Sequence, residues 1–222
     1  MIDFCVLGSG IAGSTIANLL SKKYSVHVFD KARGAGGRSS NKKLKGNLSF
    51  DHGVQYISPK SKVFTKIIQK LSKKKILKTW DGNHLDFTFE KKKLNPKYIG
   101  VKANNALSKY YWKNIKTSLC SQIIKIEHKK YFWEIKLDDN SKHQFKALII
   151  TCPFPQLKKL AGRYLEKKIS NLKIQMQPNI TVMVALTNKK ELPLSSIKFD
   201  DNMLAWAANE NSKKRFKSNL NL

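Results

Sequence analysis

The chain opens with an apolar run from Ile2 to Leu7 that ends at a glycine. A compact, mostly apolar run of this length is typical of a parallel strand buried on both faces. The small and apolar residues 11–20 predict a helix, and residues 24–30 form a second strand-like run that ends at Asp30. This order of a strand, a helix and a second strand predicts the beginning of a βαβ unit.

Gly8, Gly10 and Gly13 have the G-x-G-x-x-G spacing of dinucleotide-binding folds. There the first glycine permits a tight turn, the second lets the backbone approach a pyrophosphate at the helix N-terminus, and the third lets helix and strand pack closely. Asp30 lies about twenty residues after the central glycine, where a carboxylate binds an adenosine ribose. The alternative is a glycine turn without function, but the order of elements favours dinucleotide binding. This fingerprint does not distinguish NAD from FAD.

The residues after Asp30 distinguish the two cofactors. A usual NAD-binding domain continues with a turn and another helix, whereas this chain runs KARGAGGRSS and then LSFDHGVQYIS before any helical pattern. The glycine pair and arginine at 36–38 resemble the flavin amine oxidase superfamily. Within it, residues 30–38 and 51–56 resemble the "DK-x-x-x-x-GGR" and "D-[LH]-G-x-Q-Y" motifs of the renalase family. This resemblance implies FAD, bound noncovalently, as the cofactor.

The resemblance also implies which residues bind FAD. The glycine pair and arginine would approach the pyrophosphate and ribityl chain, Gln55 and Tyr56 would lie at the flavin end, and the backbone of Ile123 would contact the adenine. Thr151 and Pro153 would pass near the cofactor. The candidate cofactor-binding residues are Gly8, Gly10, Ile11, Ala12, Gly13, Asp30, Lys31, Gly36, Gly37, Arg38, Gly53, Gln55, Tyr56 and Ile123.

No residue is assigned a catalytic role. His52 follows Asp51 and could act as a general base, but hydride transfer to a flavin requires none, so a structural role is the favoured interpretation. The histidines are scattered and none pairs with a cysteine at ligand spacing, so no metal site is expected. Trp80, Phe87 and Phe89 are candidates to face the flavin, although sheet core is the stronger interpretation for each one.

The rest of the pattern predicts a second domain interleaved with the first. It predicts an amphipathic helix at 61–71, short aromatic-rich antiparallel strands at 77–101 and a second helix that begins near Asn104 or Asn105. A three-strand meander at 118–151 and a further strand at 180–187 follow. The predicted fold class is α/β, with a three-layer Rossmann-like FAD/NAD(P)-binding domain and an α+β substrate domain on an antiparallel sheet. The FAD-binding domain would comprise residues 1–58 and 99–155, and the substrate domain 59–98 and 156–222.

The C-terminal part resembles the renalase family only up to a point. Trp206, Ser212 and Lys213 match a family segment, with Trp206 in the expected substrate domain. The family then continues with a strand and a helix that this sequence lacks, and that helix points its positive end at the flavin. We therefore expect an exposed apolar face that a partner chain could cover, and a polar, basic tail at 209–222 that is partly disordered.

The net charge of +28 raises nucleic acid as a partner, but the lysines are scattered without an arginine and aromatic cluster. Only four of the 43 basic residues are arginine, namely Arg33, Arg38, Arg163 and Arg215. We therefore expect neither a nucleic-acid nor a membrane partner. The three cysteines have no CxxC spacing and the N-terminus resembles no signal peptide, which favours a cytoplasmic location.

The resemblance implies an FAD-dependent oxidoreductase of the renalase type. Its flavin would accept hydride from a reduced nicotinamide dinucleotide, with an NAD(P)H isomer as one candidate, and would be reoxidised by dioxygen. An amine or polyene oxidase of the same superfamily is the alternative enzyme. A truncated, non-catalytic dinucleotide-binding protein is the alternative from another class, and a nucleic-acid-binding protein ranks last.

Overall fold

The computed structural model describes residues 1–45, 48–86, 95–187, 193–200 and 203–222. It divides into two compact units, one made of 1–37 and 108–180 and the other of 38–107 and 181–222. The predicted domain boundaries differ from these units in where they place 38–58, 99–107 and 156–180. Which unit serves cofactor and which serves substrate stays a prediction. Phe87 and Phe89 lie outside the described residues.

The first unit is built on a six-stranded sheet with the order β8-β2-β1-β11-β10-β9. The first four strands in this order are parallel, and β10 and β9 add to them in antiparallel fashion. The helix after β1 and the meander of β9, β10 and β11 agree with the sequence pattern. The strands are β1 (Ile2–Leu7), β2 (Val26–Phe29), β8 (Lys116–Ser118), β9 (Ile123–His128), β10 (Trp133–Leu137) and β11 (Lys142–Ile150).

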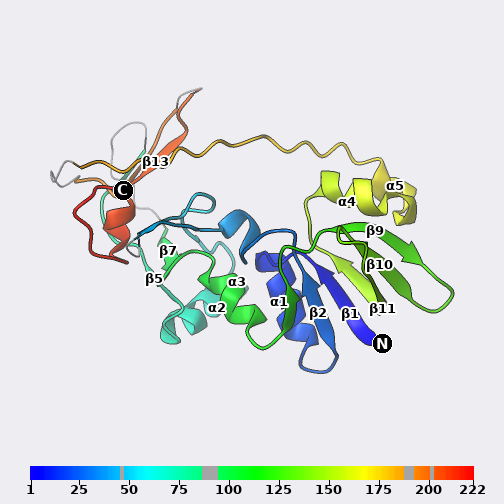
Figure 1. Ribbon diagram of the computed structural model, residues 1–222. Helices are drawn as coiled ribbons and strands as arrows, with labels where there is room; N and C mark the ends of the chain where they lie inside the picture. Colours follow the sequence, from blue (N-terminus) through cyan, green and yellow to red (C-terminus); the bar gives the residue numbers. More distant parts are fainter. Residues whose placement is uncertain (46–47, 87–94, 188–192, 201–202) are drawn as a thin grey trace. The chain divides into compact units, whose positions relative to one another are not determined.

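Helices pack on both faces of the parallel part of this sheet, and neighbouring residues of β1 point to opposite sides. Val6 packs with Ala17 of α1 (Ile11–Leu20) on one face, whereas Cys5 and Leu7 pack on the other with Ala161 of α4 (Phe154–Ala161). Figure 1 shows α1 on one side of the sheet and α4 and α5 (Lys167–Ser170) on the other. The unit therefore has the three layers of a Rossmann-like fold, and it places the loop after β1 at the carboxyl end of the parallel strands.

The second unit contains small sheets and one amphipathic helix. β5 pairs with β7, β3 with β4, and β12 with β13, all antiparallel, while β6 joins β12 in parallel. The helix α2 (Lys62–Lys73) agrees with the predicted helix at 61–71 and buries Ile68 and Leu71. The strands are β3 (Lys42–Lys43), β4 (Ser49–Phe50), β5 (Leu77–Thr79), β6 (His84–Leu85), β7 (Tyr98–Gly100), β12 (Ser196–Lys198) and β13 (Trp206–Ala208). α3 (Ala106–Trp112) crosses the boundary between the units.

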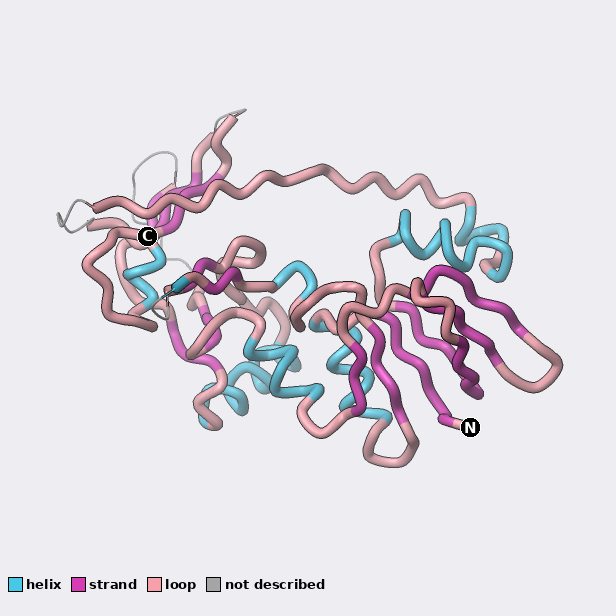
Figure 2. Tube along the Cα trace, viewed as in Figure 1, coloured by secondary structure: helices cyan, strands magenta, loops and turns pink. Residues whose placement is uncertain are grey.

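Two predictions about the C-terminal part are wrong. The apolar run at 180–187 forms no strand, and Figure 2 shows it as loop; Leu186 makes a single β-bridge with Asn221. A strand needs a neighbour for its backbone groups, and the residues Ile180 and Val182 are 89% and 79% exposed. The tail at 209–222, in contrast, is packed rather than disordered, because its charged residues Glu210 and Lys213 are buried against opposite charges.

Candidate functional site

The glycine motif forms the turn from β1 into α1. Gly8 has a φ of +101°, a backbone conformation that suits glycine, and its N–H donates to the Phe29 carbonyl at 2.8 Å. A Cβ at Gly13 would lie 1.9 Å from the Gly8 carbonyl oxygen, so glycine is required there for α1 to pack on the turn. The first and third glycines therefore have reasons within the fold itself.

The fold does not require glycine at position 10. A Cβ at Gly10 would meet only the Gly36 carbonyl oxygen at 3.8 Å and the Gly37 Cα at 3.9 Å, which are ordinary van der Waals contacts. The φ of Gly10 is −69°, which any residue adopts. The fold thus accepts a side chain at Gly10, and its absence leaves the backbone open to a close ligand.

This opening lies at the N-terminus of α1. No described side chain caps the helix there, so the first-turn N–H groups, at Ile11 and Ala12 among others, have no side-chain acceptor. These groups and the helix dipole favour a negatively charged ligand such as a phosphate. An open Gly10 at an uncapped helix N-terminus therefore fits the pyrophosphate of a dinucleotide.

The second glycine motif lies beside the first. The Gly36 N–H donates to the Ser9 carbonyl at 3.2 Å, and Gly10 and Gly36 form a β-bridge. Gly37 has a φ of +53° and would bring a Cβ within 3.4 Å of the Gly10 Cα. The glycine backbones of the two motifs thus lie against each other at Gly10.

Asp30 ends β2 and its carboxylate is fixed in orientation. Its Oδ2 accepts from the Ser9 N–H at 2.7 Å and from the Ser9 hydroxyl at 2.6 Å, and its Oδ1 accepts from the Ala32 N–H at 2.8 Å. A carboxylate has about four acceptor positions, so room remains for a ribose hydroxyl. Ser9 is fully buried and was not among the candidate residues. A hydroxyl between the first two glycines of the fingerprint was the available signal.

The remaining candidates divide between the two units. Three of them belong to the first unit. Lys31 is exposed and Ile123 is the first residue of β9. The Thr151 hydroxyl donates to the Leu7 carbonyl at 2.7 Å. Arg38, Gly53, Gln55 and Tyr56 belong to the second unit.

In the second unit, the loop from Asp51 to Tyr56, called here the 51–56 loop, is fixed from several sides. A Cβ at Gly53 would lie 2.0 Å from the Arg38 carbonyl oxygen, and the Val54 N–H donates to the same oxygen at 2.8 Å. The Asn104 side-chain amide donates to the Val54 and Gln55 carbonyls at 2.7 and 2.8 Å.

A buried charge cluster lies behind this loop and consists of Asp51, Glu210, Lys213 and Arg215, none with more than 4% of its side chain exposed. Lys213 Nζ lies 3.0 Å from Asp51 Oδ2 and 2.6 Å from Glu210 Oε1. Arg215 pairs with the same Asp51 oxygen. With all four groups ionised, the positive and negative charges are equal in number, which lets the tail bury them.

The cluster shifts the pKa values of its two carboxyl groups in opposite directions. Burial acts to raise the pKa of Asp51, but the charges of Lys213 and Arg215 outweigh it and hold this pKa below its ordinary value. Burial raises the pKa of Glu210, and the Lys213 charge only partly offsets this. The Asp51 carboxylate is thus held as an anion by both cations of the cluster. His52 lies 3.2 Å from the Ser40 hydroxyl.

Trp80 of the second unit lies next to the cluster. Trp80 is 3% exposed, its indole N–H donates to the Ser212 hydroxyl at 3.0 Å, and Lys213 Nζ lies 5.1 Å from its ring centroid. Tyr56 lies 5.7 Å from Trp206 between ring centroids. The burial of Trp80 agrees with the core interpretation favoured from the sequence.

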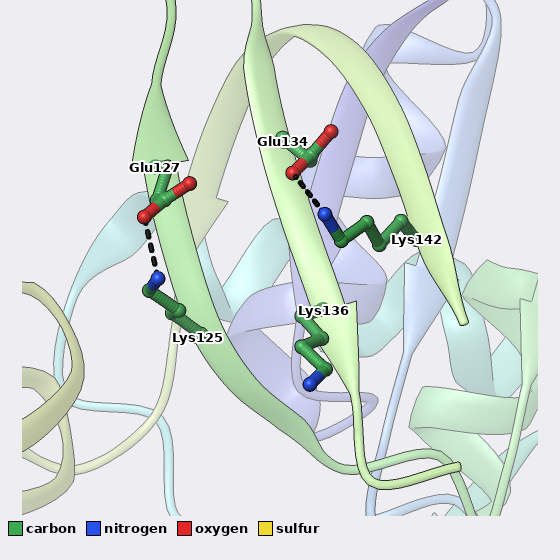
Figure 3. Close-up of a pocket in the computed structure, with 5 residues that line it drawn as sticks. All are labelled: Lys125, Glu127, Glu134, Lys136 and Lys142. Carbon is green, nitrogen blue, oxygen red and sulfur yellow. Dashed lines mark ion pairs between the residues drawn. The ribbon is translucent and has the colours of Figure 1, made fainter. Parts of the chain in front are cut away.

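A hollow on the outside of β9, β10 and β11 does not resemble a dinucleotide-binding site. Its lining is entirely charged and consists of Lys125, Glu127, Glu134, Lys136 and Lys142. Figure 3 shows Glu127 paired with Lys125 and Glu134 with Lys142, at 2.6 and 3.4 Å. Its carboxylates are thus already paired by lysines of the same sheet.

Within the described ranges, no group of histidine, cysteine or acidic side chains is arranged to hold a metal ion. The helices of the described residues are all too short or too polar to span a bilayer.

Comparisons with known proteins agree with this geometry. Residues 6–71 match a family model described as an NAD(P)-binding Rossmann-like domain. Mouse (Mus musculus) renalase is 29% identical over 168 residues, an alignment that covers 71% of this chain and 48% of renalase. The chain thus spans about half the length of this curated relative.

Solved structures of flavin oxidases share the fold. A protein from Exiguobacterium sp. 255-15, provisionally assigned as a protoporphyrinogen oxidase, superimposes with a TM-score of 0.69 at 8% identity over 99% of this chain and 75% of its own. A putrescine oxidase variant with a redesigned cofactor site gives 0.66 at 10% identity over 99% and 74%. The predicted Rossmann-like fold class and the predicted resemblance to renalase are therefore both confirmed.

Proposed function

We propose that this chain is an FAD-dependent oxidoreductase of the renalase type. The observation that carries the proposal is the open Gly10 at the uncapped N-terminus of α1, facing the Gly36–Gly37 backbone. The similarity to renalase and to flavin oxidase structures supports FAD as the dinucleotide and oxidoreductase as the enzyme class.

The residues present have distinct tasks in this proposal. The N–H groups at the start of α1 bind the pyrophosphate, with Gly10, Gly36 and Gly37 allowing close approach. Asp30, held by Ser9, accepts hydrogen bonds from the adenosine ribose, and the Ile123 backbone contacts the adenine. Arg38 supplies positive charge for the phosphates.

The 51–56 loop serves the flavin end. The Gln55 side chain is already held by groups of its own unit, so Tyr56 and the loop backbone would make the contacts. FAD, when bound, supplies a ring that accepts a hydride. No side chain is required to remove a proton if the substrate delivers only hydride, which is consistent with a structural His52.

The substrate class in this proposal is a reduced nicotinamide dinucleotide, with an NAD(P)H isomer as the specific candidate and dioxygen as the electron acceptor. The net charge of +28 favours a phosphorylated substrate over a cationic amine, because opposite charges attract at long range. A cytoplasmic location remains part of the proposal.

The test begins with the visible spectrum of the purified chain and a titration with FAD, followed by anaerobic addition of a reduced nicotinamide dinucleotide or of a primary amine. We expect a yellow protein whose flavin band bleaches with the dinucleotide and returns with dioxygen. Bleaching by the amine alone would favour an amine oxidase. A colourless chain that takes up no FAD would refute the proposal and favour a non-catalytic protein.

A further inference from the structure

The Lys213 ammonium group uses all of its hydrogen-bonding capacity inside the second unit. Lys213 is 1% exposed, and its three N–H groups have three acceptors: Asp51 Oδ2 at 3.0 Å, Glu210 Oε1 at 2.6 Å and Gln55 Oε1 at 3.1 Å. The first two acceptors balance its charge. The third is a neutral amide oxygen in the 51–56 loop and contributes nothing to that balance.

The contact with Lys213 determines how the Gln55 side chain is oriented. An ammonium group only donates, so it must face the amide oxygen of Gln55 and not the amide nitrogen. The nitrogen then points back into the loop, where it donates to the Asp51 carbonyl and, at 3.4 Å, to the Gly53 carbonyl. Gln55 thereby closes the loop on itself.

Stability alone does not explain a lysine at this position. Buried ion pairs cost desolvation, and apolar residues of similar volume are often equally stabilising or better. An apolar side chain at 213, with a neutral residue at 210, could fill the space next to Trp80. It could not hold the Gln55 amide.

We propose that Lys213 is a positioning residue that, through Gln55, fixes the 51–56 loop in the conformation which serves the flavin end; this inference rests on the proposed function. Lys213 touches neither cofactor nor substrate in this role. It acts on the loop, and the loop places Tyr56.

The test separates charge balance from positioning. Lys213→Met leaves two carboxylates against Arg215 and should destabilise the unit for that reason alone. The double variant Lys213→Met/Glu210→Gln leaves Asp51 and Arg215 as a neutral pair and should regain most of the unfolding midpoint in urea. Lys217→Met removes one positive charge from an exposed residue and serves as the matched control.

The first readout needs no cofactor. It is hydrogen exchange of the Gln55 side-chain amide and of the Val54 backbone N–H, measured by NMR on the FAD-free chain. We expect at least tenfold faster exchange at both groups in the double variant and no change in Lys217→Met. Unchanged exchange in a double variant with wild-type stability would overturn the proposal.

A second variant keeps the proposal falsifiable if the double variant does not fold. Gln55→Leu leaves Lys213 with both of its carboxylates, so the cluster should persist while Val54 exchange rises by the same tenfold. Unchanged Val54 exchange in Gln55→Leu would equally refute the positioning role.

The cofactor readout is the FAD dissociation constant and the position of the flavin absorption bands. We expect weaker binding and shifted bands in the double variant, with both unchanged in the control. If the wild-type chain takes up no FAD, the proposed function fails, but the exchange measurements still decide what Lys213 does.

Discussion

Replacing Gly10 by alanine separates ligand binding from folding. The added Cβ would meet only atoms at 3.8 and 3.9 Å, and the φ of −69° suits alanine. Alanine lowers the entropy of the unfolded chain but is a poorer helix N-cap than glycine, so the two effects offset each other to within about 1 kcal/mol. The free energy of unfolding should therefore hardly change.

The effect of this methyl group on FAD binding should be large. It occupies the space through which a pyrophosphate reaches the first-turn N–H groups of α1. Charge-assisted hydrogen bonds contribute about 1.5–3 kcal/mol each, so losing two of them costs about 3 kcal/mol or more. That corresponds to a dissociation constant on the order of 100-fold higher.

Two other glycines calibrate this prediction. Gly13→Ala would bring a Cβ within 1.9 Å of the Gly8 carbonyl oxygen, a backbone atom, so we expect a loss of about 2–3 kcal/mol in stability. Gly34→Ala meets nothing within 4 Å and should change neither stability nor binding. Urea unfolding and FAD titration by flavin fluorescence give both quantities for all three variants. A Gly10→Ala chain that is stable and binds FAD like wild type would refute the assignment of α1 as the pyrophosphate site.

Two further predictions concern buried titratable groups. Burial, with the charges of Lys116 and His143, lowers the pKa of His27 from 6.5 to about 4, so between these values the unfolded chain binds a proton that the folded chain does not. Stability should thus fall as pH falls from 6.5 to about 4, and urea unfolding of His27→Gln should show a flatter profile in this window. Asp51→Asn leaves buried cations underpaired and should cost about 3–5 kcal/mol, against about 1 kcal/mol or less for the exposed Asp139→Asn. Equal unfolding midpoints for the two asparagine variants would contradict the role of Asp51.

The first unit was predictable because its signals are local. The strand, turn and helix of residues 2–20 are set by a mostly apolar run and by glycines whose spacing reflects contacts a few residues apart. Gly13 illustrates this, since a Cβ there would meet the Gly8 carbonyl oxygen of the same turn, and the φ of +101° at Gly8 belongs to that turn as well. Asp30 was predictable for the same reason, because it directly follows β2 of the same βαβ unit.

The charge cluster was not predictable because its partners are distant in sequence. The tail at 209–222 has the composition of a disordered segment, and its one acid, Glu210, can balance only one of the two charges of Lys213 and Arg215. Asp51, the acid that balances the other, lies 162 residues away from Lys213. The strand predicted at 180–187 is absent for the converse reason. Its composition suits a strand, but a strand also requires a neighbouring strand to pair with.

The predictions for the tail and for the strand at 180–187 are both wrong because the structure of each segment depends on contacts with distant residues. The same dependence leads to an expectation about how the second unit folds. Asp51 and Gln55 of the 51–56 loop both contact Lys213, so we expect the loop and the tail to become ordered together. Contacts across so many residues require a large loss of chain entropy before they form. The local βαβ unit carries no such requirement. The 51–56 loop should accordingly be the later-forming part of the proposed FAD site, and its order should depend on a lysine that the cofactor never meets.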